Sequence, residues 1–96
     1  MPTYIMMINM TDQGVRTIKD LPTRKKNANE MGQKLGVERK SLYMTFGPYD
    51  FVQVCTAPSD DAMAQYALML GSMGNVRTTV MRAFEETEHD KVIAKL

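Results

Sequence analysis

A hairpin signal at the centre of the chain constrains its fold more than any other feature. The segment MTFGPYDFVQV at residues 44–54 contains two strand-like runs separated by a Gly-Pro pair. Proline fixes φ for a turn and glycine frees the backbone beside it, so the pair predicts a tight reversal between strands at residues 37–46 and 49–56. An acid directly after such a turn typically bonds backbone amides. The residues assigned to this structural turn are Gly47, Pro48 and Asp50.

A helical pattern precedes the hairpin. Apolar residues recur at helical spacing over residues 15–35, after a cap at Thr11 or Asp12. Pro22 lies inside this span. Because proline is tolerated only in the first turn of a helix, the helix is either kinked at this position or restarts near Asp20.

A second helical pattern follows the hairpin. Ser59 is a good cap, and Asp60 and Asp61 place negative charge where the helix dipole favours it. This helix is expected to end near Gly71. The remaining elements are expected at residues 3–10 (a strand), 75–84 (a strand) and 87–96 (a short terminal helix).

The predicted order is therefore strand, helix, two hairpin-linked strands, helix and strand, followed by a short helix. Right-handed crossovers fold this βαββαβ order into a four-stranded antiparallel sheet with both main helices on one face. Ninety-six residues are too few for two domains, so residues 1–96 are expected to form one α+β domain.

The second face of this sheet is left uncovered, because no further segment is long enough to pack on it. Successive strand residues alternate between faces. The more aliphatic sets are expected under the helices, which assigns the more mixed set to the open face. The residues expected under the helices are Leu42, Met44, Phe46, Val52 and Val54. A mixed aromatic patch on the order of 500 Å² usually marks an interaction site. The set assigned to this patch is Tyr43, Thr45, Tyr49, Phe51, Gln53 and Cys55.

Three partners would suit this open face: a second copy of the chain, RNA bases stacked on the rings, or a small ligand between two copies. The formal net charge is +1, with 12 basic and 11 acidic residues interspersed. RNA and anionic membranes both require concentrated basic charge, so neither is expected as a partner. A homodimer or higher homo-oligomer is favoured, with an interface at Tyr43, Thr45, Tyr49, Phe51 and Gln53.

The remaining composition favours a reduced compartment. A single cysteine allows no internal disulfide. The apolar start, MPTYIMMINM, is too short to cross a membrane, lacks the basic residues that begin a signal peptide, and alternates like a strand. A cytoplasmic location is therefore expected.

Three segments resemble the GYD-domain family, which is named for its Gly-Tyr-Asp motif. They are TDQGVRTIKD at residues 11–20, GPYDFV at 47–52 and GSMGNVRTTVMRAF at 71–84. The motif occurs here as Gly47, Tyr49 and Asp50, with a proline inserted. The resemblance spans essentially the whole chain and implies a ferredoxin-like domain of the dimeric α/β-barrel type, in which two sheets pack face to face. It supplies no catalytic residues.

Candidate chemistry in the sequence is sparse. His89 is the only imidazole and lies in an acidic turn, where a solvated residue is the favoured interpretation over a haem ligand or a general base. No cofactor is expected. No metal site is expected either, because no second His or Cys is paired with His89. Cys55 has no neighbouring cation that would form a thiolate, which favours a buried apolar role. Arg77 and Arg82 lie on opposite faces of a strand, so one of them could anchor a carboxylate. A salt bridge across a dimer, or an edge-strand charge that discourages aggregation, accounts for them equally well.

Three functions remain open. The leading hypothesis is a dimeric barrel that binds a small molecule at or near the sheet face, through Tyr43, Tyr49, Gln53 and Arg82. The first alternative is a cofactor-independent oxygenase or isomerase of an aromatic or enolic metabolite, with Tyr43, Tyr49 or Asp50 as its acid or base. The second alternative is a structural or stress-related oligomer without a ligand.

Overall fold

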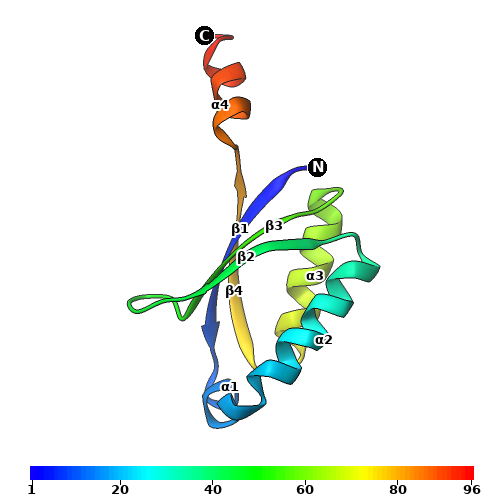
Figure 1. Ribbon diagram of the computed structural model, residues 1–96, viewed down its shortest axis with the longest axis vertical. Helices are drawn as coiled ribbons and strands as arrows, with labels where there is room; N and C mark the ends of the chain where they lie inside the picture. Colours follow the sequence, from blue (N-terminus) through cyan, green and yellow to red (C-terminus); the bar gives the residue numbers. More distant parts are fainter.

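The computed structural model describes residues 1–96 and confirms the predicted order of elements (Figure 1). The first half contains β1 (Thr3–Met10), α1 (Asp12–Arg16), the 3-10 turn η1 (Ile18–Asp20) and α2 (Leu21–Lys34). The second half contains β2 (Glu38–Met44), β3 (Phe51–Thr56), α3 (Asp60–Ser72), β4 (Val76–Ala83) and α4 (Glu86–Ile93).

The four strands form one antiparallel sheet in the order β2-β3-β1-β4. Helices α2 and α3 lie side by side against one face of this sheet, and the chain leaves the other face open (Figure 1). This is the ferredoxin-like arrangement that the βαββαβ order predicts. None of the helices has the length and apolar run needed to cross a membrane.

The helix ends form where their capping residues predict. The hydroxyl of Thr11 accepts a hydrogen bond from the Gly14 amide at 3.2 Å, and that of Ser59 accepts one from the Ala62 amide at 3.1 Å. The helical region after β1 does not continue through Pro22 as one kinked helix. It stops, passes through η1, and restarts as α2 with Pro22 in the first turn, so the second of the two expected alternatives is confirmed.

The core lies between the sheet and α3. Tyr4, Met6 and Ile8 alternate along β1 and are buried, as are Met63 and Tyr66 on the facing side of α3. Helix α2 packs less closely, because Gly32 is its only buried residue. A Cβ atom at Gly32 would lie 3.2 Å from the Tyr66 ring, so this glycine lets α2 approach α3 at one point.

The predicted faces of β3 are inverted in the structure, which corrects the interface assignment. Register pairs Phe51, Gln53 and Cys55 with the core residues of β1, and all three are buried beneath the helices. The aliphatic pair Val52 and Val54 lies on the open face instead. The prediction failed because it placed the more aliphatic set of β3 in the core, whereas β1 sets the faces of its neighbour through pairing.

The segments that resemble the GYD family meet at one end of the sheet. The Asp50 carboxylate accepts a hydrogen bond from the Met10 amide at 2.8 Å. The Thr11 hydroxyl donates to the Gly74 carbonyl at 2.6 Å, and the Gln13 amide donates to the Asn75 side chain at 2.9 Å. Together these bonds fix the end of β1 to the hairpin and to the start of β4.

Two parts of the chain extend beyond the packed body. The hairpin between β2 and β3 projects on one side, and α4 stands apart from the sheet at the end of β4 (Figure 1). The molecule is accordingly elongated, with principal extents of 49 × 31 × 18 Å. Phe46 at the hairpin tip is fully exposed and Met44 is 75% exposed, so neither lies under the helices as the sequence predicted, because the hairpin projects beyond them. The apolar residues of α4 and its flanks are more than 45% exposed: Phe84, Val92, Ile93 and Leu96.

Candidate functional site

A cavity of about 100 Å³ lies between the sheet, α2 and α3. Its walls are mainly apolar, and they come from every layer of the fold: Ile8 from β1, Leu21 from α2, Leu42 from β2 and Leu70 from α3. Helix α2 covers this part of the sheet less completely than α3 does, since Gly32 is its only fully buried residue. Apolar walls with a few polar groups are typical of a small-molecule site.

One buried polar side chain lines this cavity without a hydrogen-bond partner. Gln53 is 4% exposed, and its Nε2 atom makes no hydrogen bond within the chain. Tyr66 and Cys55 are polar neighbours of the Gln53 side chain. Burial raises the pKa of the Tyr66 phenol, and the Gln53 amide opposes that increase. An unpartnered buried donor costs about 1–3 kcal/mol, which makes it a candidate contact for a bound acceptor.

Three cations surround the same cavity: Arg24 and Lys25 from α2, and Arg39 from β2. None of them is in an ion pair, and no Asp or Glu lines the cavity. Arg24 donates through Nη2 to the carbonyls of Gly14 and Thr17, while its Nε atom is buried without a partner. The cavity therefore combines apolar walls with uncompensated positive charge.

Sequence patterns missed these cations for two reasons. Arg24 and Lys25 belong to a basic cluster that is typical of a solvated helix face, yet they follow Leu21 by three and four residues and so continue its inward-facing stripe. Arg39 is turned inward by a β-bulge between Arg39 and Ser41, which breaks the strict alternation of β2. The stripe could have been detected from sequence, but the bulge could not.

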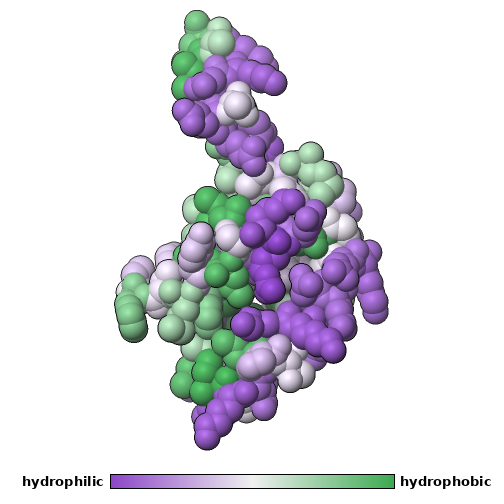
Figure 2. All heavy atoms as spheres, viewed as in Figure 1, coloured by the Kyte–Doolittle hydropathy of each residue, from purple (hydrophilic) through white to green (hydrophobic).

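The open face of the sheet carries a second candidate surface. Its centre is an aliphatic patch, which we call the open-face patch: Ile5, Met7, Val52, Val54 and Met81. Met81 is exposed and the other four are half-buried. Polar residues such as Arg77 and Thr79 border the patch on β4. Figure 2 shows apolar residues along the strands and at the hairpin tip, and polar residues over the outer side of α2.

The structure separates the residues predicted to bind a ligand. Gln53 lines the cavity, whereas Tyr43 lies on the open face with a 61% exposed side chain. Tyr49 and Thr45 lie in the hairpin loop, where the Thr45 hydroxyl donates to the Tyr49 carbonyl at 2.7 Å. The loop turns at Gly47, whose φ of 122° favours glycine. These side chains therefore do not converge on one site.

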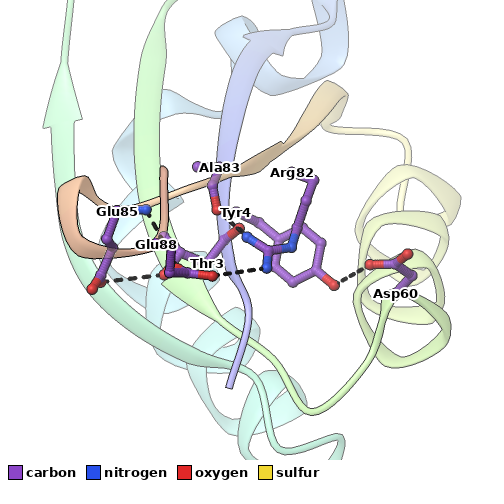
Figure 3. A network of polar contacts seen from close by, with 7 residues as sticks. All are labelled: Thr3, Tyr4, Asp60, Arg82, Ala83, Glu85 and Glu88. Atoms are coloured by element: carbon purple, nitrogen blue, oxygen red, sulfur yellow. Dashed lines mark hydrogen bonds and ion pairs between the residues drawn. The ribbon is translucent and has the colours of Figure 1, made fainter. Parts of the chain in front are cut away.

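Arg82, the fourth predicted ligand-binding residue, belongs to a polar network at the start of β1 (Figure 3). Its guanidinium donates to the Thr3 carbonyl at 3.3 Å and to the Ala83 carbonyl, and pairs with Glu88 of α4 at 3.2 Å. It also lies over the rings of Tyr4 and Phe84, at 5.9 and 4.7 Å from their centroids. Because its guanidinium contacts residues of all three elements, Arg82 joins β1, β4 and α4.

Tyr4 carries this network to α3 through a short hydrogen bond from its hydroxyl to Asp60 (Figure 3). Burial and the Asp60 carboxylate raise the pKa of Tyr4, so the phenol stays protonated at neutral pH.

The other candidate groups do not form a reactive site. Burial raises the pKa of the Cys55 thiol, so the thiol stays protonated. His89 lies on the surface, 3.3 Å from Asp90. No group of His, Cys, Asp and Glu side chains is placed to hold a metal ion.

Comparisons with known proteins agree with this fold. The GYD domain pattern matches residues 4–93. A curated relative from Thermus thermophilus, named "Glutamine synthetase and cystathionine beta-lyase binding protein", is 38% identical over 84 residues, which cover 86% of this chain and 88% of the relative. The crystal structure of TTHA0845 from the same organism has a TM-score of 0.56 at 21% identity, and covers 88% of this chain and 95% of that one.

A second solved structure, FFRP-DM1, has a TM-score of 0.62 at 16% identity and covers 88% of this chain and all of its own. At such low identity the two structural matches show the shared fold alone.

Proposed function

This chain belongs to the GYD domain family, and we propose that it is a homo-oligomeric binding protein whose open face pairs with a second copy and whose cavity takes a small molecule. The observation that carries this proposal is that the sheet is apolar on both faces, while the chain covers only one. Strands that read as nearly continuous apolar runs, such as TYIMMINM, are typical of sheets buried on both sides.

The exposed area of the chain supports pairing. The accessible surface is 6481 Å² for 10.9 kDa. A folded monomer of this mass exposes about 5,600 Å². The excess of about 900 Å² is close to the roughly 800 Å² that each partner buries in a standard protein interface. An apolar centre with a polar border is also the usual anatomy of such an interface.

A second copy suits this surface because a two-fold interface needs one self-complementary patch, and the open-face patch is continuous over three neighbouring strands. The projecting α4, with its exposed apolar residues, would then pack on the partner. The open-face patch and the exposed apolar side of α4 therefore both favour a second copy of the chain as the partner.

Binding rather than catalysis is supported by the acid and base groups. The Asp50 carboxylate is engaged by the Met10 amide, which leaves it poorly placed to act as the general base of the oxygenase or isomerase alternative. Tyr43 lies on the open face, where a partner sheet would cover it. The phenols and the thiol with raised pKa values are proton-bound at neutral pH.

A second candidate function is the binding of other proteins. It is favoured by the relative that is 38% identical and named for binding two enzymes, glutamine synthetase and cystathionine beta-lyase. The exposed tip residue Phe46, which neither the sheet nor the helices cover, is the side chain best placed for such a contact.

Native mass spectrometry of the protein, purified without denaturant, tests the proposal. We expect a dimer or larger even-numbered oligomer, and its thermal stability should rise with protein concentration. A reproducible extra mass on the oligomer would support a small ligand. A monomer at micromolar concentration, with stability independent of concentration, would contradict the proposal.

A further inference from the structure

The geometry of the cavity points to a ligand class: we propose that it binds a small monocarboxylate with an apolar body. This inference rests on the proposed function, because it names the ligand of the same cavity. It uses three independent features of the site: the uncompensated cations, the unpartnered Gln53 amide and the size of the apolar space.

The sign of the ligand charge follows from the lining. Arg24, Lys25 and Arg39 bring three positive charges to a cavity without a lining carboxylate. None of the three is in an ion pair. Lys25 is exposed, whereas Arg24 and Arg39 are half-buried beside the apolar space, where an anion is attracted more strongly than in water. Arg39 is the best placed of the three, because its side chain has neither an ion pair nor a hydrogen bond within the chain and is half-buried.

The hydrogen-bond donors favour a carboxylate. Gln53 Nε2 lies at the sheet wall of the cavity and has no acceptor. A carboxylate has two oxygens and can accept from an amide and a guanidinium together. The same lining argues against an amino acid, since its ammonium group would find no Asp or Glu within the cavity.

The size of the apolar space limits the body of the ligand. The cavity measures about 100 Å³, which is smaller than the roughly 150 Å³ engineered cavity that holds benzene. The apolar body is therefore limited to about the size of one small ring or a short branched aliphatic chain. Ile8, Leu21, Leu42 and Leu70 provide matching aliphatic walls.

Three matched compounds test the ligand class: 4-methylpentanoate, its uncharged amide 4-methylpentanamide, and leucine, which adds an ammonium group to the same skeleton. Their affinities would be measured by isothermal titration calorimetry at low salt, with hydrogen exchange of α2 as a second readout. We expect the acid to bind about tenfold or more tightly than either analogue, and to slow exchange in α2.

Two variants locate the binding site. Arg39→Gln should reduce the affinity for 4-methylpentanoate to about that of the amide, and Gln53→Met should weaken binding while keeping or raising stability, because it removes an unpartnered buried donor. Lys40→Gln is the matched control, because Lys40 is an exposed neighbour paired with Glu38 and does not line the cavity. Its affinity for the acid should equal that of the wild type.

The outcomes separate the inference from the proposed function. Equal binding of the acid and the amide would overturn the ligand class but leave a small-molecule site in the cavity. Acid binding that survives Arg39→Gln and Gln53→Met would place the ligand elsewhere and overturn the inference. No binding by a folded dimer would also overturn it without affecting sheet pairing, whereas a monomer would contradict the proposed function itself.

Discussion

At the scale of single residues, burial decides the chemistry of this chain. Cys55 and Tyr66 are 0% and 3% exposed, and burial raises the pKa of both above their ordinary values of 9.0 and 10.0. The buried groups resist losing their protons because a charge in the core would lack solvation. They therefore stabilise the fold as neutral groups and do not provide a nucleophile or a base at neutral pH.

These shifts predict a loss of stability in alkali. The folded state holds the protons more tightly than the unfolded state, so the contribution is fully present below the unfolded pKa and is lost as the pH rises through the folded pKa. We expect the free energy of unfolding, measured in urea, to fall above about pH 9. Tyr66→Phe should make this fall shallower, because the ring remains and the titrating hydroxyl is removed.

Tyr49→Phe is the control, since it removes a phenol from the hairpin loop rather than from the core. An alkaline fall that is equally steep in the wild type and in Tyr66→Phe would show that Tyr66 does not couple its proton to folding.

At the scale of elements, the junction at the end of β1 holds the sheet together. Asp50 accepts from the Met10 amide, and its own amide donates to the Ile8 carbonyl at 2.9 Å. Asp50→Ala should lower the free energy of unfolding by about 1–3 kcal/mol, because it leaves a partly buried amide without its charged acceptor. Urea denaturation followed by circular dichroism would measure the change.

Asp50→Asn should recover part of this loss, since its side-chain oxygen can still accept from Met10. Asp61→Asn changes an exposed acid elsewhere and controls for the change in charge. If Asp50→Ala is as stable as the wild type, the hairpin is held to β1 by backbone pairing alone.

The sequence predicted the elements well because each carries a local signal. The caps at Thr11 and Ser59, Pro22 in a first turn and the turn at Gly47 depend on neighbouring residues only. The faces of β3 and the inward turn of Arg39 were not predicted, because they depend on pairing with β1 and on a bulge. Both are properties of the sheet rather than of the strand.

This difference explains why the fold was predicted more fully than the site. Of the residues predicted to bind a ligand, only Gln53 lines the cavity. The cavity residues come from distant segments, and Arg39 reaches it only through the bulge. A site whose residues are brought together by strand pairing and a bulge cannot be located from the alternation of side chains along one strand, even when every element is correctly predicted.

At the scale of the whole molecule, the inverted face of β3 strengthens the case for assembly. Val52 and Val54 are more aliphatic than the mixed set that the sequence had assigned to the open face, and they extend the apolar surface of Ile5 and Met7. Together with the excess surface and the projecting α4, they support the proposal that a second copy completes the packing of this chain.

Sedimentation velocity at micromolar concentration tests this pairing most directly, on the wild type, Val52→Lys and Leu68→Lys. We expect the wild type and Leu68→Lys, which alters a 74% exposed residue on α3, to sediment as the same dimer or larger oligomer. Val52→Lys should sediment as a folded monomer, because it places a charge at the centre of the paired sheets. A monomeric wild type would contradict the proposed pairing of the sheets, and so would a Val52→Lys variant that forms the same oligomer as the wild type.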